Sequence, residues 1–220
     1  MFTKGIKILV LKTSFCKISF SVSFAFENLQ AKKMNPFGQK IKKGMLLVAE
    51  PFLQDENFRG AVILICDHNA EGTFGLIVNR SAHIPVSSVV ENFSSIKQSI
   101  FYGGPVQPET LHFVHTIGKS VDASIAVADG IFWGGHIEII TAMAELGQLK
   151  KNEVRFFSGY AGWEPDQLQF EINNGDWYLC EADVEILFHT KPDDIWQAAL
   201  HKLGGNYEII SDFNKTQSLN

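Results

Sequence analysis

The segment Ala61–Asn79, AVILICDHNAEGTFGLIVN, decides the fold. Ala61–Asp67 and Thr73–Asn79 are two runs rich in residues that favour β-strands, and His68–Gly72 lies between them. Asn and Gly in such a linker tolerate the backbone conformations that a hairpin turn needs. We therefore expect an antiparallel hairpin at the centre of a β-sheet.

Strand patterns continue on both sides of this hairpin. Helical spacing is limited to a few short segments, such as the face made by Ile139, Ile140, Met143 and Leu146, which Gly147 ends. Because the helices do not alternate regularly with the strands, we expect a mixed α+β fold. The expected strands are Met45–Ala49, Ser99–Tyr102, Leu111–Thr116, Ala123–Ala128, Glu153–Ser158, Trp177–Cys180 and Val184–Phe188; the other expected helices are Val86–Phe93, Pro165–Asn174 and Trp196–Leu203, the last capped by Thr190.

The first 33 residues differ from the rest of the chain. They hold six lysines and one acidic residue, and Lys12 and Lys17 interrupt the only apolar stretch that could form a signal peptide. No run there is long enough to span a bilayer. We expect residues 1–33 to be a mis-assigned or disordered extension before a start at Met34, residues 34–210 to form one domain, and residues 211–220 to be a flexible tail.

Charge and cysteine content limit the possible partners and location. The whole chain carries a net charge of −5, and residues 34–220 carry −10. Such a surface repels a phosphate backbone, so we expect no direct nucleic-acid binding. Cys66 and Cys180 each lie in an apolar run and form no CxxC spacing, which favours buried thiols in the reducing cytoplasm. We also expect no membrane partner.

Motifs for catalysis or metal binding are absent from the sequence. His112 and His115 lie three apart in an expected strand and therefore face opposite sides of it. His136-Ile137-Glu138 lacks the second histidine of a metalloprotease helix, and Ser158 lacks the preceding glycine of a nucleophile elbow. We expect no metal site, no cofactor and no recognisable catalytic residue.

Glycines and aromatic residues recur together in this chain. Ile100-Phe101-Tyr102-Gly103-Gly104 is echoed by Ile131-Phe132-Trp133-Gly134-Gly135, and Phe156–Trp163 combines the same residue types. These segments can be loops that offer backbone N–H groups and stacking faces to a ligand. They can equally be tight strand exits and packed corners, which is the commoner use of such residues.

Several ordered motifs resemble the AlgH/YqgE family of bacterial proteins. They are Gly44-Met45-Leu46, Gly72–Arg80, Tyr102–Val106, Phe157–Trp163 and Gln167-Leu168. The resemblance implies a bifurcated mixed β-sheet folded into a pseudo-barrel with flanking helices, and it supplies no accepted catalytic residue. The family's description as a transcriptional regulator is an inherited name. The chain departs from the family at His136-Ile137, where Asp-Phe commonly follows the glycine pair.

Two hypotheses of function follow. In the first, the protein is a non-catalytic binding or regulatory module for a small molecule or protein partner. Its expected ligand-binding residues lie at or beyond strand ends and share one concave surface: Asn79, Gly103, Gly104, Tyr160, Gly162 and Trp163. In the alternative, it is a hydrolase or transferase that uses dispersed residues such as Asp67, His68, Asn79 and His115.

Overall fold

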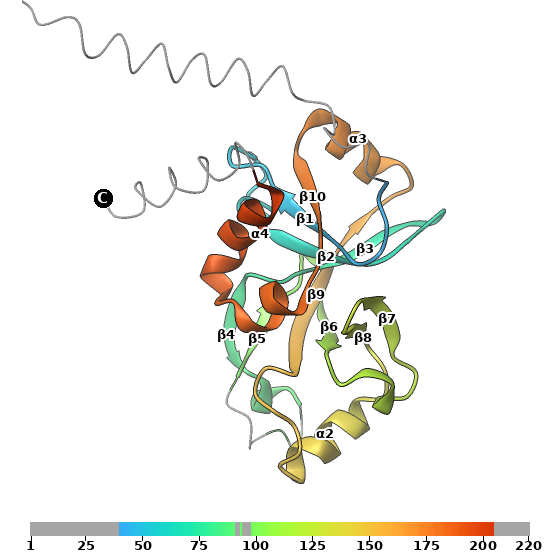
Figure 1. Cartoon of the computed structure of the whole chain (residues 1–220), viewed down its shortest axis with the longest axis vertical. Helices are drawn as coiled ribbons and strands as arrows, with labels where there is room; N and C mark the ends of the chain where they lie inside the picture. Colours follow the sequence, from blue (N-terminus) through green and yellow to red (C-terminus); the bar gives the residue numbers. More distant parts are fainter. Residues whose placement is uncertain (1–39, 91–92, 94–97, 205–220) are drawn as a thin grey trace, which may run out of the picture.

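The computed structural model describes residues 40–90, 93 and 98–204 (Figure 1). The extension expected at residues 1–33 and the tail expected at residues 211–220 lie outside these described residues. Within the described part, no helix has the length and apolar character needed to cross a membrane.

Ten strands of the described part form one connected sheet. Its main path runs β10-β1-β2-β3-β9-β6-β8-β7, and β4 and β5 branch from β9. All pairings are antiparallel except β5 with β9. The strands are β1 (Met45–Ala49), β2 (Val62–Asn69), β3 (Gly72–Ile77), β4 (Ser81–Pro85), β5 (Ser99–Tyr102), β6 (Val106–His115), β7 (Ile125–Ala128), β8 (Ile131–Trp133), β9 (Val154–Trp163) and β10 (Trp177–Glu181).

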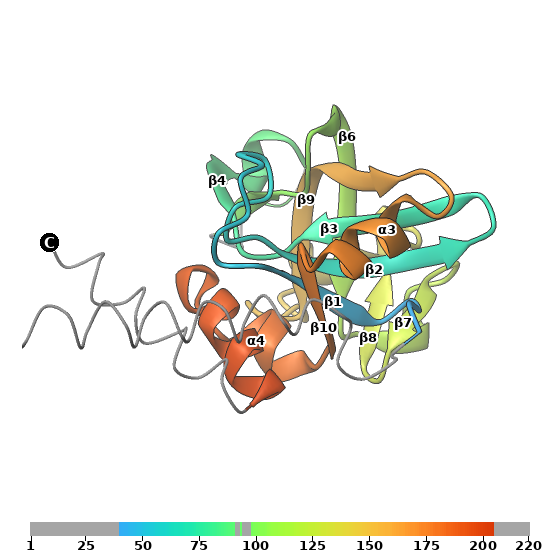
Figure 2. The same ribbon diagram turned by 90° about the horizontal axis from the view of Figure 1, so that it is seen from above.

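The long strand β9 is the branch point of the sheet. One edge pairs with β6, from Val154 to Tyr160. The other edge divides: Phe157 and Ser158 pair with β5, whereas the stretch from Ala161 to Trp163 pairs with β3. The sheet curls around this strand into a half-barrel (Figure 2). The expected α+β class with a bifurcated sheet is confirmed.

The central strands are buried on both faces. Leu46, Val48 and Leu64 pack on the side of α4 (Ile195–Leu203), whereas Leu47 and Ile63 pack on the side of α3 (Gln167–Asn174). Because successive strand residues face opposite sides, the sequence reads as continuous apolar runs and not as an alternation. The hairpin of β2 and β3 and the exact bounds of β1 are as predicted.

A third cluster forms the lower end of the molecule in Figure 1. There α2 (Ile137–Glu145) buries Ile140 and Ala144 against residues of β5, β6 and β9. The predicted helix at Val86–Phe93 is described only as a short 3₁₀ turn, η1 (Val86–Ser88). Residues 91–92 of that prediction are outside the described part.

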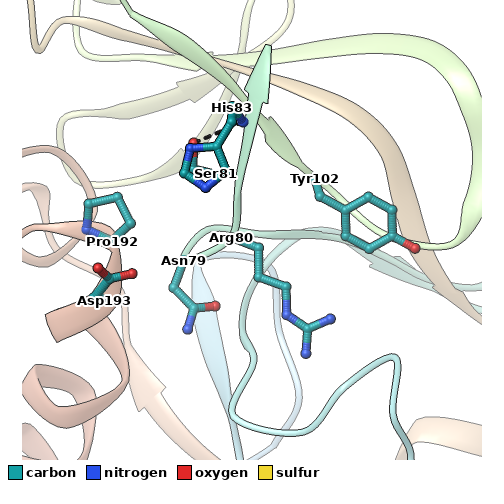
Figure 3. A pocket seen from close by; sticks show the side chains of 7 residues that line it. All are labelled: Asn79, Arg80, Ser81, His83, Tyr102, Pro192 and Asp193. Carbon is teal, nitrogen blue, oxygen red and sulfur yellow. Dashed lines mark hydrogen bonds between the residues drawn. The ribbon is translucent and has the colours of Figure 1, made fainter.

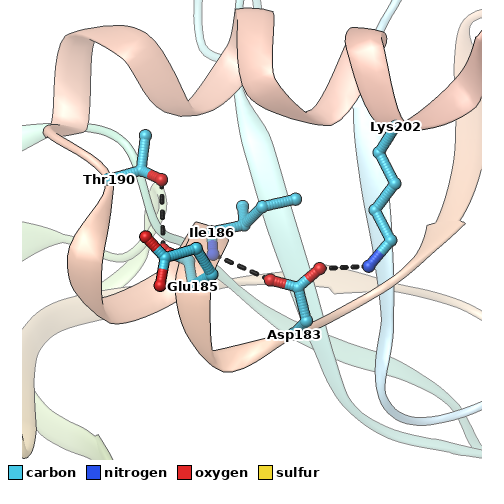
Figure 4. Close-up of polar contacts among 5 residues, drawn as sticks. All are labelled: Asp183, Glu185, Ile186, Thr190 and Lys202. Carbon is cyan, nitrogen blue, oxygen red and sulfur yellow. Dashed lines mark hydrogen bonds and ion pairs between the residues drawn. The ribbon is translucent and has the colours of Figure 1, made fainter.

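The prediction of a strand at Val184–Phe188 is wrong. Glu185–His189 forms a π-helical turn, η3. Asp183 accepts a hydrogen bond from the backbone N–H of Ile186 at 2.8 Å and pairs with Lys202 of α4 (Figure 4). Burial alone would raise the pKa of Asp183, but these bonds lower it. This tertiary contact outweighs the β-propensity of Ile186 and Phe188.

Several other boundaries differ from expectation, most clearly those of β9 and α4. β9 continues beyond its expected end at Ser158 through Gly159–Trp163, which we interpreted as a loop or a packed corner. α4 begins at Ile195 after the 3₁₀ turn η4 (Pro192–Asp194), and Thr190 does not cap it. Instead, the Thr190 hydroxyl donates to the carbonyl of Glu185 at 3.0 Å and closes η3 (Figure 4).

Candidate functional site

An open pocket of about 540 Å³ lies where three segments distant in sequence meet. One wall is the connection from β3 into β4, a second is the end of β5, and a third is η4. Figure 3 shows Pro192 and Asp193 across from Asn79. The lining residues are Asn79, Arg80, Ser81, His83, Tyr102, Pro192 and Asp193.

Asn79 and Arg80 are held rigidly by the loop that precedes β2. The Asn79 amide accepts a hydrogen bond from Val62 N–H at 2.9 Å and donates to the Gly60 carbonyl at 2.8 Å. The Arg80 guanidinium donates to the carbonyls of Asn57 at 2.6 Å and Arg59 at 2.8 Å. Both side chains are therefore fixed before any ligand arrives, and both residues line the pocket.

The other walls carry polar groups of lower burial. Tyr102 is half-buried, and its backbone N–H donates to the Arg80 carbonyl at 2.8 Å. This bond joins the end of β5 to the connection between β3 and β4. His83 is exposed and has a φ of 57°, and its N–H donates to the Ser81 hydroxyl at 3.2 Å. Partial burial lowers the pKa of Arg80, although Tyr102 and Asp55 oppose that change. The pocket thus offers cationic, hydroxyl and carboxylate groups together.

Gly103 and Gly104 are buried against the backbone of β9. The Gly103 N–H donates to the Ser158 carbonyl, and the Gly103 carbonyl accepts from Ile77 N–H, each at 2.8 Å. A Cβ on Gly103 would lie 2.2 Å from the Gly159 carbonyl oxygen, and one on Gly104 would lie 2.2 Å from the Tyr160 carbonyl. The pair permits close strand packing, and the N–H of Gly103 is already used inside the protein.

The aromatic residues expected at the site lie on opposite faces of β9. The Tyr160 ring is 4.8 Å from Phe74 and 5.8 Å from His112, within a half-buried aromatic cluster that also contains Trp133. The Trp163 ring lies on the α3 side, 6.0 Å from Trp177. Residues an odd number apart on one strand cannot line the same surface. Gly162 is exposed beside Tyr160.

Of the six expected ligand-binding residues, the structure places Asn79 alone at the pocket. The sequence reasoning missed the other residues that line it. Arg80 and Tyr102 belong to the motifs Gly72–Arg80 and Tyr102–Val106 and are adjacent to the expected site residues Asn79 and Gly103, so the sequence did contain a signal for both. Pro192 and Asp193 carry no comparable signal, because only the tertiary fold brings η4 to β4.

The dispersed residues of the enzyme hypothesis are not gathered at one place. Asp67 and His68 lie on the exposed end of the β2–β3 hairpin, where His68 Nδ1 is 2.7 Å from the Thr73 hydroxyl. Asn79 follows the opposite end of β3. His115 is fully buried in β6. Among residues 40–90, 93 and 98–204, no three His, Cys, Asp or Glu side chains are grouped so that they could hold a metal ion.

The predicted opposite orientation of His112 and His115 is confirmed. His112 contacts Phe74 on one face of β6, whereas His115 stacks on Phe132 on the other, with ring centroids 5.6 Å apart. His115 Nε2 lies 3.1 Å from the Gly134 carbonyl oxygen, and within the described part of the chain its Nδ1 has no partner. Burial lowers the pKa of His115, and the Gly134 bond opposes that effect.

This burial predicts a loss of stability in acid. The unfolded chain binds the His115 proton with a pKa of about 6.5, whereas the folded chain resists it. Stability is therefore complete above pH 6.5 and falls as the pH drops below it. His115→Phe should reduce the slope by up to about 1.4 kcal/mol per pH unit, measured by urea unfolding between pH 7.5 and 5. Equal slopes in the two proteins would contradict this assignment, since His112 is present in both.

The fold and the pocket define a class: a half-barrel α+β protein with a polar pocket at the branch of its sheet. The AlgH-like family matches residues 46–208, and the chain belongs to that family. A UPF0301 protein of Chlorobium limicola is 36% identical over 181 residues, covering 82% of this chain and 97% of the relative. One from Cytophaga hutchinsonii is 34% identical over 181 residues, covering 82% and 100%.

Two solved structures share the fold. The crystal structure of a Corynebacterium diphtheriae protein has a TM-score of 0.69 at 25% identity and covers 81% of this chain and 97% of its own. The solution structure of AlgH from Pseudomonas aeruginosa has a TM-score of 0.62 at 27% identity and covers 79% and 95%. The resemblance found in the sequence motifs is thereby confirmed.

Proposed function

We propose that the protein is a binding module that holds a small polar ligand in the pocket between β4, β5 and η4. The observation that carries this proposal is the meeting of fixed polar side chains from three segments around one concavity. Asn79 remains part of the proposed site. A pocket of about 540 Å³ is within the usual size range for small-molecule sites.

The exposed rim and the hydrogen-bonded floor of this site have different roles. Asn79 and Arg80 are tied to the preceding loop, so they form a preorganised floor. His83 and Asp193 are exposed, so they can adjust to the ligand. Fixed groups at the floor reduce the entropy that binding must otherwise cost.

The same proposal includes a cytoplasmic location and no direct contact with DNA. Cys66 and Cys180 are buried free thiols. Burial raises the pKa of both, that of Cys180 to about 12, which keeps them protonated and unreactive. The net charge of −10 over residues 34–220 disfavours a nucleic-acid partner. A regulatory role would then act through the ligand or through another protein.

A thermal-shift screen of the full chain against metabolites and nucleotides tests the proposal. A ligand at 100 times its Kd stabilises the native state by about 2.7 kcal/mol and raises Tm. His83→Asn should reduce that shift and leave the ligand-free Tm unchanged, because Asn tolerates the positive φ of this position. His136→Asn, at an exposed histidine outside the pocket, is the matched control. The proposal fails if the two variants respond alike.

A further inference from the structure

Arg155 is a buried cation without an acidic partner in the described part of the chain. Its side chain extends from β9 and is 9% exposed. The guanidinium donates to the carbonyls of Val78 at 3.2 Å and Thr190 at 3.3 Å, and it lies 4.7 Å from the centre of the Phe101 ring. No carboxylate of the described residues lies within 4.0 Å of it. Burying a charge without a counter-ion is costly.

Both carbonyls that Arg155 contacts belong to residues that closely precede pocket-lining residues in the sequence. The Val78 carbonyl belongs to the peptide group whose nitrogen is that of Asn79. Thr190 precedes Pro192 by two residues and begins the segment that forms the η4 wall. The guanidinium therefore joins the two segments that continue into these walls and places a positive charge next to both segments.

Arg80 lines the pocket itself and supplies a second cation. Its guanidinium contacts two neutral carbonyls, those of Asn57 and Arg59. Burial lowers the pKa of Arg155 to about 10, so this guanidinium is charged at neutral pH. Lys191 and Asp194 flank the two lining residues of η4 with opposite charges, and both are exposed.

One carboxylate, Asp193, lines the pocket, and it is exposed. Water and salt screen an exposed charge much more strongly than a buried one. The two guanidinium groups therefore dominate the field in the pocket, and the exposed carboxylates of Asp193 at the rim and Asp55 near Arg80 oppose them.

We infer that the ligand of this pocket is a small oxyanion, a carboxylate or phosphate compound, drawn by Arg80 and by the buried charge of Arg155. The inference rests on the proposed binding function and names its ligand class. Arg155 acts as a positioning residue, because it joins the walls and does not itself line the pocket. Arg80, Ser81 and Tyr102 line the pocket and supply the direct contacts.

Titration of the full chain with inorganic phosphate, malonate and chloride at equal ionic strength tests the inference. Phosphate or malonate should raise Tm more than chloride does. The anion that gives the larger increase shows whether the ligand is a phosphate compound or a carboxylate. Asp193→Asn should tighten binding of that anion by roughly two- to fivefold, since it removes an opposing exposed charge. Asp194→Asn, at the adjacent exposed residue outside the pocket, is the control and should have a smaller effect.

Arg155→Met provides the second arm. It replaces the buried cation by an apolar chain of similar length and should abolish the anion-specific shift. If this variant does not fold, the change in anion affinity caused by Asp193→Asn still shows whether the pocket favours negative charge. Weaker anion binding by Asp193→Asn would overturn the inference. So would a cationic or neutral metabolite that binds while phosphate and malonate have the same effect as chloride. Either result would leave the proposed binding function standing. No hit of any kind would reject both.

Discussion

Gly104→Ala is expected to lower the free energy of unfolding by about 4 kcal/mol, one of the largest effects of any single substitution in this chain. The new Cβ would lie 2.2 Å from both the carbonyl carbon and the carbonyl oxygen of Tyr160. Those atoms belong to β9, which cannot withdraw without breaking its pairing with β3 and β6. Gly104 also has a φ of 154°, which an L-residue rarely adopts.

Two other glycines separate the steric effect from the backbone effect. Gly103→Ala has the steric clash without positive φ and should cost about 2–3 kcal/mol. Gly134→Ala has a φ of 66° and no atom within 4 Å of its Cβ, and it should cost about 1 kcal/mol. Urea unfolding monitored by circular dichroism measures all three. A similar small loss in each variant would show that β9 and the strand exit at Gly103-Gly104 are not tightly packed.

Glu171→Ala is expected to lower the free energy of unfolding by about 3 kcal/mol. One carboxylate oxygen of Glu171 accepts hydrogen bonds from the indole N–H groups of Trp163 and Trp177, each at 2.8 Å. These two tryptophans are 5% and 3% exposed, so truncation would leave two buried donors without an acceptor. The other oxygen accepts from Gln167 at 2.9 Å, and that bond would also be lost.

Matched variants in α3 isolate the contribution of the indole bonds. Glu171→Gln keeps one carbonyl acceptor and should cost about 1 kcal/mol. Gln169→Ala removes an exposed bond to Asn173 in the same helix and should change stability by less than about 0.5 kcal/mol. Tryptophan fluorescence provides a second readout, because Trp163 and Trp177 would gain solvent contact. Equal losses in Glu171→Ala and Gln169→Ala would contradict the role given to the carboxylate.

Sequence patterns predicted most elements whose identity depends on local signals. The β2–β3 hairpin has Gly72 at the turn and continuous apolar runs on both sides, and the structure has it at that place. β1 and β5 have the predicted bounds. These segments are central or short, so local propensity and burial favour the same conformation.

Elements whose conformation depends on distant contacts could not be predicted in the same way. Glu185–His189 carries strand-like residues, but Asp183 and Lys202 hold it as a helical turn. β9 continues through its glycines because β3 and β6 supply hydrogen-bond partners there. A glycine-rich segment lacks its own strand signal, so pairing decides its conformation.

The residues of the candidate site could be predicted only in part, because their positions also depend on tertiary contacts. Asn79 was selected because it ends a strand, and it does line the pocket. Trp163 was selected from the same kind of pattern, but its face of β9 is buried against Phe58 and Trp177. The face on which a side chain lies depends on the strand register, and a loop assigned in place of a strand gives no register.

The branching of the sheet at β9 has a consequence for biosynthesis. β3, β5 and β6 all leave the ribosome before Val154–Trp163 has been made, and each needs β9 as a neighbour. During synthesis at about 5–20 residues per second, their edges stay without a partner for several seconds. Unpaired edges of this kind favour association with other nascent chains or with chaperones. The nascent chain should therefore acquire protease resistance in one late step, when β9 emerges, and not gradually with length.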